Sequence, residues 1–144
     1  MNTPRASFSV YYKHYGEEEI IVAGGYVNGK LTTSCEVYSV AKDQWREFSP
    51  MNYAKASCIL GVIDSRYLYC IGGVAKDQSK RGSLTNIIEC IDLYNPVHWN
   101  KLSIGTPMNN CDFGCIPVSD HRLLIYGGWN NEPHKKAFTL RRKE

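Results

Sequence analysis

The residues best able to do chemistry in this chain are six cysteines and four histidines. Cys111 and Cys115, with three residues between them, are followed by His121 and could supply part of a zinc site. Their spacing is unlike that of common zinc ligand sets, and no fourth ligand lies nearby in the sequence. We therefore expect neither a metal site nor a cofactor.

The cysteines instead bear on compartment and reactivity. Cys58, Cys70 and Cys90 each lie inside an apolar segment, which is typical of small buried side chains in a reducing cytosol. Residues 1–8 lack the apolar core of a signal peptide, so a secreted disulfide framework is not indicated. We predict a cytoplasmic protein in which these three thiols are reduced and react slowly, because apolar burial disfavours the thiolate.

A catalytic role has little support. The histidines fall in different turns and loops, and no two have the spacing of a pair on one face; they are His14, His98, His121 and His134. The sequence contains neither a nucleophile motif nor a glycine-rich phosphate-binding loop. An enzyme is therefore the least favoured class of function, and we predict no catalytic residue.

The distribution of charge argues against nucleic acid as a partner. The chain has 17 basic and 14 acidic side chains, but positions 135–144 alone carry five basic residues against one acidic residue, a net charge of +4. The remainder has 12 against 13, a net charge of −1, and no coherent basic face for phosphate. No apolar run approaches the ~20 residues of a membrane helix, so we expect no membrane partner either.

The elements that hold these side chains repeat along the sequence. Segments starting at Met1, Met51 and Met108 begin alike, and each continues into two short apolar stretches, the second ending in a glycine pair. Two repeats then reach a tyrosine and a tryptophan, which the third lacks. The shared residues are Gly24, Gly25, Tyr38 and Trp45, then Gly72, Gly73, Tyr94 and Trp99, and finally Gly127 and Gly128.

The apolar runs predict strands rather than helices. They are four to seven residues long, rich in Ile, Val and Tyr, and separated by turn signals. Glycine inside a strand is unfavourable unless the backbone must bend or approach another segment closely, so three copies predict such a need. We expect antiparallel strands in chain order near 7–12, 19–24, 34–39, 44–48, 57–63, 67–72, 86–94, 98–102, 113–118, 122–127 and 136–141.

A glycine doublet, a tyrosine and a tryptophan in that order, at a period of ~50 residues, resemble the kelch repeat. The resemblance covers nearly the whole chain, and the first residues, Met1 to Arg5, match the family's entry to its first strand. It implies an all-β, partial kelch-type propeller of about three four-stranded antiparallel blades, with the first strand nearest the axis and the tryptophan strand at the rim. The blades would span 1–49, 50–105 and 106–144, the third without its last strand.

The two complete repeats differ in the spacing of their marker residues. Trp45 follows Tyr38 by seven residues, whereas Trp99 follows Tyr94 by five. This difference predicts a shortened turn around Pro96.

The second and third repeats carry two further departures. The polar insertion at 74–83 in the second is expected to form a long exposed loop. Arg5 and Lys55 share a repeat position, where their charges could face the channel or the top of the propeller. In the third repeat, Asp112 is expected to replace this basic residue.

Three blades are too few to close a ring, because propellers typically have 4 to 8. The end blades should therefore leave apolar surfaces uncovered, and we expect self-association or completion by further blades. The residues expected beside these surfaces are Phe8, Val10 and Ile21 in blade one, and Ile116, Leu124 and Tyr126 in blade three.

Kelch propellers mostly bind other proteins through loops between the second and third strands and between blades. The resemblance thus implies a non-catalytic protein–protein interaction module whose partner the sequence does not identify. The matching loops are 26–33, 74–85, 129–135 and 52–55. The partner-binding candidates are Tyr26, Tyr53 and Trp129 as aromatic anchors, and Lys55, Lys76, Lys80 and Arg81 as attraction for an acidic partner. The alternatives are a fragment of a larger kelch propeller acting as a structural or cytoskeletal adaptor and, with less support, a propeller enzyme.

Overall fold

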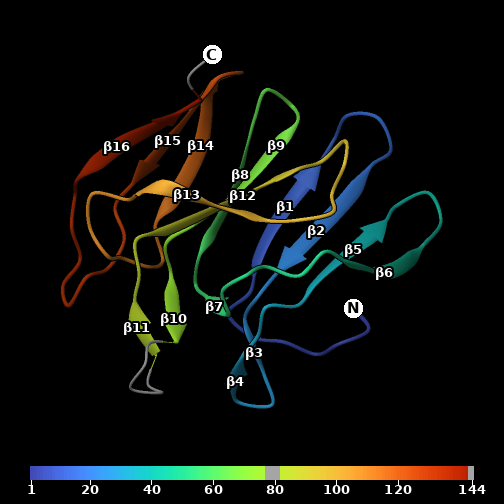
Figure 1. Ribbon diagram of the computed structural model, residues 1–144, viewed down its shortest axis with the longest axis horizontal. Helices are drawn as coiled ribbons and strands as arrows, with labels where there is room; N and C mark the ends of the chain where they lie inside the picture. The colour runs from blue at the N-terminus through green and yellow to red at the C-terminus, as the bar shows by residue number, and fades with distance from the viewer. Residues whose placement is uncertain (77–81, 143–144) are drawn as a thin grey trace.

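The computed structural model describes residues 1–76 and 82–142. Over these ranges the chain forms sixteen β-strands and no helix, so no described helix could cross a membrane. Eleven strands build three antiparallel sheets that fan out side by side, and the other five are short (Figure 1). Within residues 1–76 and 82–142 the sheets form no closed ring. The prediction of an all-β, partial propeller is confirmed.

In each sheet, every long strand pairs antiparallel with the long strand before it, as predicted. The first sheet contains β1 (Ser9–Lys13), β2 (Glu19–Ala23), β5 (Cys35–Ser39) and β6 (Gln44–Phe48). The second contains β8 (Ile59–Ile63), β9 (Tyr67–Ile71), β12 (Ile87–Asp92) and β13 (Asn100–Gly105). The third contains β14 (Gly114–Ser119), β15 (Arg122–Tyr126) and β16 (Ala137–Arg141).

The short strands were not predicted, and they correct one expectation. They are β3 (Tyr26–Val27), β4 (Lys30–Leu31), β7 (Lys55–Ala56), β10 (Val74–Lys76) and β11 (Gly82–Leu84). The insertion at 74–83 is therefore not simply a loop, because β10 pairs with both β11 and β7. Ala75 is buried in that small sheet. Residues 77–81 lie outside the described residues.

The core lies between neighbouring sheets. The first strands, β1, β8 and β14, lie side by side and border a shared hollow. On β9, Leu68 and Cys70 pack against the first sheet, whereas Tyr69 and Ile71 pack towards the third. Side chains alternate across a strand, so the near-continuous apolar run of β9 supplies both faces of the middle sheet. Each fully buried aliphatic side chain of this kind stabilises the fold by about 1.5–3 kcal/mol.

The glycine pairs of the first two repeats lie where the backbone closely approaches the next repeat, and a need for close approach was predicted. Gly24 and Gly25 have φ angles of 65° and 94°, in the left-handed region. A Cβ atom on Gly24 would overlap the carbonyl oxygen of Lys55, and the amide of Gly25 donates to that same oxygen at 2.8 Å. The pair therefore lets one repeat hydrogen-bond to the start of the next.

This contact shows which residues are equivalent and corrects the position assigned to Asp112. The amide of Gly73 donates to the carbonyl of Asn110 at 2.9 Å, just as Gly25 donates to Lys55. Asn110, not Asp112, therefore occupies the place of Arg5 and Lys55. The next residue but one has a left-handed backbone in all three repeats: Ser7 (φ 52°), Ser57 (φ 49°) and Asp112 (φ 53°).

The sheet register also corrects the tyrosine of the second repeat. In the first repeat, Tyr38 pairs with Ile20, which lies four residues before Gly24. In the second repeat, the residue four before Gly72 is Leu68, and its partner is Ile91. Ile91 is therefore the counterpart of Tyr38. Tyr94 instead lies in the turn after β12 and is 72% exposed. The interval from Ile91 to Trp99 is eight residues, so this turn is longer than that of the first repeat, not shorter.

The two outer faces of the array carry exposed apolar side chains. Val10 and Tyr12 of β1 are about half exposed, and so are Ile116 and Val118 of β14. The inclusion of Ile21 in such a face was wrong. It is 1% exposed and packs in the core towards the second sheet.

Candidate partner-binding surface

The residue that follows each glycine pair lies at the same end of its sheet. These residues are Tyr26, Val74 and Trp129. Tyr26 exchanges two backbone hydrogen bonds with Ala6, at 2.8 and 3.1 Å, and Trp129 exchanges two with Cys111, at 2.9 and 3.2 Å. Backbone pairing therefore holds both aromatic residues in fixed positions.

Two adjoining grooves follow this row of residues. The first is lined by Tyr26, Gly29, Lys30, Leu31, Lys76 and Gly82. The second is lined by Val74, Gly82, Ser83, Leu84, Asn109, Cys111, Trp129, Asn130 and Asn131. Because the grooves share Gly82, we call the combined residues the loop-edge surface. Its strands β3, β4, β10 and β11 lie at the lower end of the view in Figure 1.

Three of the predicted partner-binding residues lie together on the loop-edge surface. Tyr26 and Lys76 line the first groove, and Trp129, which is 43% exposed, lines the second. Tyr53 lies elsewhere, with its ring 5.5 Å from the ammonium group of Lys101 on β13. Binding of a partner by any of these residues stays a prediction.

Lys55 is removed from the partner-binding candidates, because its side chain is completely buried. Lys55 lies on β7, where its backbone carbonyl accepts the hydrogen bond from the amide of Gly25 in the first repeat. Its ammonium group points into the core. The expectation of a charge facing the channel or the top is therefore wrong at this position. Lys80 and Arg81 lie outside the described residues.

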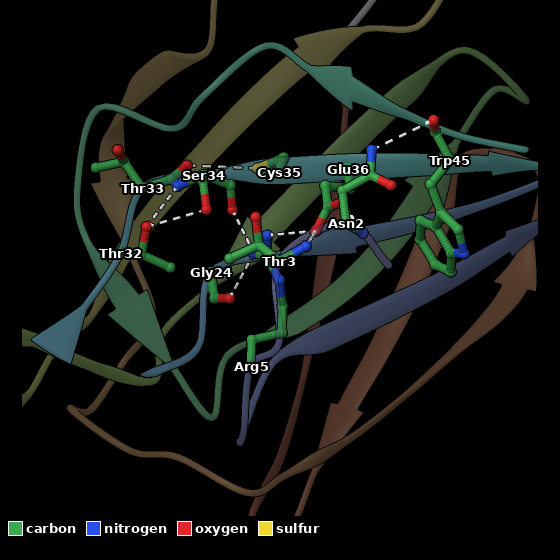
Figure 2. Close-up of polar contacts among 10 residues, drawn as sticks. All are labelled: Asn2, Thr3, Arg5, Gly24, Thr32, Thr33, Ser34, Cys35, Glu36 and Trp45. Atoms are coloured by element: carbon green, nitrogen blue, oxygen red, sulfur yellow. Dashed lines mark hydrogen bonds and ion pairs between the residues drawn. The ribbon is translucent and has the colours of Figure 1, made fainter. Parts of the chain in front are cut away.

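Arg5, which occupies the position of Lys55 in the first repeat, forms a buried ion pair with Glu36 (Figure 2). Its guanidinium group contacts the carboxylate of Glu36 at 2.7 Å and donates to the carbonyls of Gly24 and Ser34 at 2.9 and 2.8 Å. The backbone amide of Asn2 donates to the other carboxylate oxygen of Glu36 at 2.7 Å. This pair ties the start of the repeat to its second and third long strands.

Lys55 and Glu89 form the same arrangement in the second repeat. The ammonium nitrogen lies 3.2 Å from a Glu89 carboxylate oxygen, and both side chains are fully buried. The backbone amide of Asn52 donates to the other carboxylate oxygen of Glu89 at 2.8 Å. A buried charge is strongly unfavourable without a partner, so these groups are stable only together.

At the equivalent, described positions of the third repeat, 110 and 138, there is no ion pair. Phe138 pairs with Ile125, as Glu36 pairs with Val22 and Glu89 with Cys70. The neutral Asn110 stands in place of the base, and its amide nitrogen lies 3.4 Å from Nε2 of His134. The signal in the sequence was the shared position of Arg5 and Lys55. Their acidic partners could be identified only once the strand register was known.

The residues considered for a zinc site lie in different surroundings. Cys115 packs in the core between the second and third sheets, whereas Cys111 contacts Trp129 at the loop-edge surface. His121 contacts Asp64. Within 1–76 and 82–142, no three His, Cys, Asp or Glu side chains are placed to hold a metal ion.

The fold and the repeated contacts define a repeat protein built as an open array of propeller blades. Comparison with known families and proteins agrees, since the kelch motif matches residues 14–52. Alpha-scruin of Limulus polyphemus is 31% identical over 121 residues, covering 79% of this chain and 12% of the relative. An F-box/kelch-repeat protein of Arabidopsis thaliana is 32% identical over 80 residues, covering 56% of this chain and 17% of the relative.

A solved structure supports the same fold. YjhT matches with a TM-score of 0.71 and 19% identity, over 87% of this chain and 34% of its own. At that identity the likeness concerns the fold alone. The chain belongs to the kelch-repeat family, and it spans less than a fifth of the length of the two sequence relatives described above.

Proposed function

We propose that this chain is a non-catalytic protein–protein interaction module that binds its partner on the loop-edge surface. The observation that carries the proposal is the row of Tyr26, Val74 and Trp129, in which two aromatic side chains border adjoining grooves. Aromatic side chains held in place by their surroundings are the usual energetic anchors of protein interfaces.

The charge of the first groove favours a partner segment with acidic residues. Lys30 and Lys76 are both exposed and line this groove, and its described lining contains no acidic side chain. Charge complementarity at an interface increases the association rate and disfavours partners of the wrong sign.

Substitution of the anchors tests this surface. A partner recovered with the chain is titrated against Tyr26→Ala, Trp129→Ala and, as a matched control, Tyr94→Ala, which removes an exposed aromatic side chain elsewhere. We expect Trp129→Ala and Tyr26→Ala to weaken binding by about tenfold or more, since hot-spot truncations cost at least ~2 kcal/mol, and Tyr94→Ala to have little effect. Equal affinities for all four proteins would overturn the proposal.

A second candidate function is a structural or cytoskeletal adaptor, with this chain forming part of a larger kelch propeller. It is supported by the small share of each relative that the chain spans and by the exposed apolar faces of the array. On this view the blades divide at 1–49, 50–105 and 106–144. The flanking reading frame tests it directly, because further kelch repeats there would establish the larger propeller.

We propose a cytoplasmic location for the module. All six cysteines are free thiols, and four of them are buried. Free thiols are the usual state of cysteine in a reducing compartment. Fractionation of the source cells tests this proposal, and recovery of the protein only from a secreted fraction would contradict it.

A further inference from the structure

Two buried cysteines contact each other at the junction of the first two sheets. Cys58 immediately precedes β8, and Cys70 lies on the neighbouring strand β9. Their sulfur atoms are 3.3 Å apart, and the two residues are only 7% and 0% exposed. The buried apolar side chains of the surrounding core include Ile21, Leu60 and Leu68.

Polar groups from three other strands surround this thiol pair. The hydroxyl of Ser9, on β1, lies 3.0 Å from the sulfur of Cys58 and also donates to the Cys58 carbonyl. The ammonium group of Lys55 donates to the carbonyl of Cys70 at 3.3 Å, while it pairs with Glu89. One cation and one hydroxyl group therefore adjoin the thiols within the core.

These surroundings separate the acidities of the two thiols. The hydrogen bond from Cys70 and the charge of Lys55 outweigh burial and lower the pKa of Cys58 to about 7. Cys70 is the donor of that hydrogen bond. Its donation to Cys58 and the desolvation of burial raise the pKa of the Cys70 thiol well above its usual range. Burial raises the pKa of Cys35 to about 12. At Cys58, burial still raises the pKa, but the other contributions outweigh it. The slow reaction expected of Cys58, Cys70 and Cys90 stays a prediction.

We propose that Cys58 and Cys70 form a reversible disulfide when the protein meets hydrogen peroxide, so that the pair is a redox modification site. Geometry carries the proposal: the sulfur atoms need only close from 3.3 Å to the disulfide length of about 2.0 Å. Cys58 is the thiol that reacts first, because it keeps some exposure whereas Cys70 has none.

The reaction balances in two steps. The thiolate of Cys58 attacks one peroxide oxygen, the oxygen–oxygen bond breaks, and hydroxide leaves, so that sulfur is oxidised to a sulfenic acid. The thiol of Cys70 gives its proton to that hydroxide and attacks the sulfur of Cys58. The sulfur–oxygen bond breaks, and the second hydroxide takes up the proton that Cys58 lost. Two thiols and one peroxide become one disulfide and two waters.

Peroxide treatment of the native chain tests the proposal. After oxidation, the remaining thiols are alkylated, and disulfide-linked peptides are identified by mass spectrometry without reduction. We expect the chain to lose the mass of two hydrogen atoms, with one linkage between Cys58 and Cys70, and to regain them when treated with a dithiol reductant. Cys58→Ser and Cys70→Ser should lose the linkage, whereas the matched control Cys35→Ser, another buried thiol, should keep it.

The pH dependence of Cys58 oxidation tests whether the charges of Lys55 and Glu89 influence this thiol. Sulfenic acid formation at Cys58 is followed against pH in Cys70→Ser and in the triple variant Cys70→Ser/Lys55→Met/Glu89→Leu, which removes both charges together. The titratable groups that interact with the thiol pair include Lys55, Glu89 and, on β5, Cys35. We expect the triple variant to react with a midpoint at higher pH, whereas a purely structural role would leave the midpoint unchanged.

Two results would overturn the proposal. One is oxidation that spares Cys58 and Cys70 while the half-buried Cys90 and Cys115 react. The other is the same mixture of linkages in the native chain and in the urea-unfolded chain, since a preformed pair requires the native contact. The comparison with unfolded protein keeps the test decisive even where a cysteine variant folds poorly.

Discussion

Two buried ion pairs define the first two repeats at the level of single residues. Arg5–Glu36 and Lys55–Glu89 each join the start of a repeat to its third long strand. A buried pair is weak evidence for stability, because desolvation offsets much of the attraction. Its main consequence is that neither partner can be replaced alone without leaving a buried charge. In the third repeat the two equivalent positions hold the uncharged Asn110 and Phe138.

Removal of one partner should therefore cost far more than removal of both. We expect Lys55→Met to destabilise the fold by about 3–5 kcal/mol, because Glu89 is left as an uncompensated buried charge. The double variant Lys55→Met/Glu89→Leu should lie within about 1–2 kcal/mol of the unmodified chain, since similar apolar residues can replace a buried pair. Urea unfolding measures both. A double variant as unstable as the single one would contradict this account.

The same pair predicts a pH dependence of stability. Desolvation alone would lower the pKa of Lys55, but Cys70, Cys58 and Glu89 together raise it above its usual 10.5. Because the folded-state pKa is the higher one, the stabilisation is complete below about pH 10.5 and is lost as the pH rises through the folded value.

Urea midpoints across a pH series check this dependence. Chains with and without Lys55→Met/Glu89→Leu are compared, both carrying Cys58→Ser so that this thiol does not titrate. Their difference in stability should be level from neutral pH to about pH 10 and should change only above it. A difference that already changes near neutral pH would show that another group is responsible.

At the level of elements, composition and periodicity predicted all eleven long strands but not their equivalence. Glu36-Val37-Tyr38 resembles Asp92-Leu93-Tyr94, yet the register makes Glu89 the counterpart of Glu36. The side-chain period of a strand is two, so an apolar run specifies which face is buried more clearly than which residue pairs with which. The irregular register of β12 against β13, between Ile87 and Glu89, adds to this ambiguity.

The glycine pairs allow the cost of close approach to be separated from the cost of backbone strain. Gly24 and Gly16 have the same φ of 65°, but a Cβ on Gly24 would overlap the Lys55 carbonyl, whereas the space around Gly16 is open. A left-handed alanine costs about 1–2 kcal/mol. We expect Gly16→Ala to lose that amount and Gly24→Ala to lose several kcal/mol, as measured by urea unfolding. Equal losses would mean that the contact between repeats is unimportant.

At the level of the whole molecule, the sequence predicted the location of the candidate site better than its chemistry. Tyr26 and Trp129 follow glycine pairs, and that position alone places them at one end of the array. Lys55 could not be assigned correctly from the sequence, which placed it in a predicted loop, where a lysine is usually exposed. Only the register of the strands brings Glu89 beside it. The contact between Cys58 and Cys70 likewise depends on how two neighbouring strands pair.

The open array also exposes apolar side chains on both outer faces, and this predicts association. Val10 is 55% exposed on the first sheet, and Val118 is 47% exposed on the third. Burial of apolar surface stabilises a complex by about 25 cal/mol per Å². Roughly 300 Å² of such surface would thus contribute several kcal/mol before the costs of association. Head-to-tail contact between two copies would place a first sheet against a third sheet.

Charged substitutions on these faces should reduce association. We expect the chain to show a concentration-dependent increase in mass by light scattering, and Val10→Lys/Val118→Lys to shift it towards monomer, because a buried lysine without a partner is costly. The control is Val97→Lys, which adds one lysine in the turn before β13, where Val97 is 54% exposed, and should leave association unchanged. A monodisperse monomer of the unmodified chain at high concentration would show that the exposed faces need no partner.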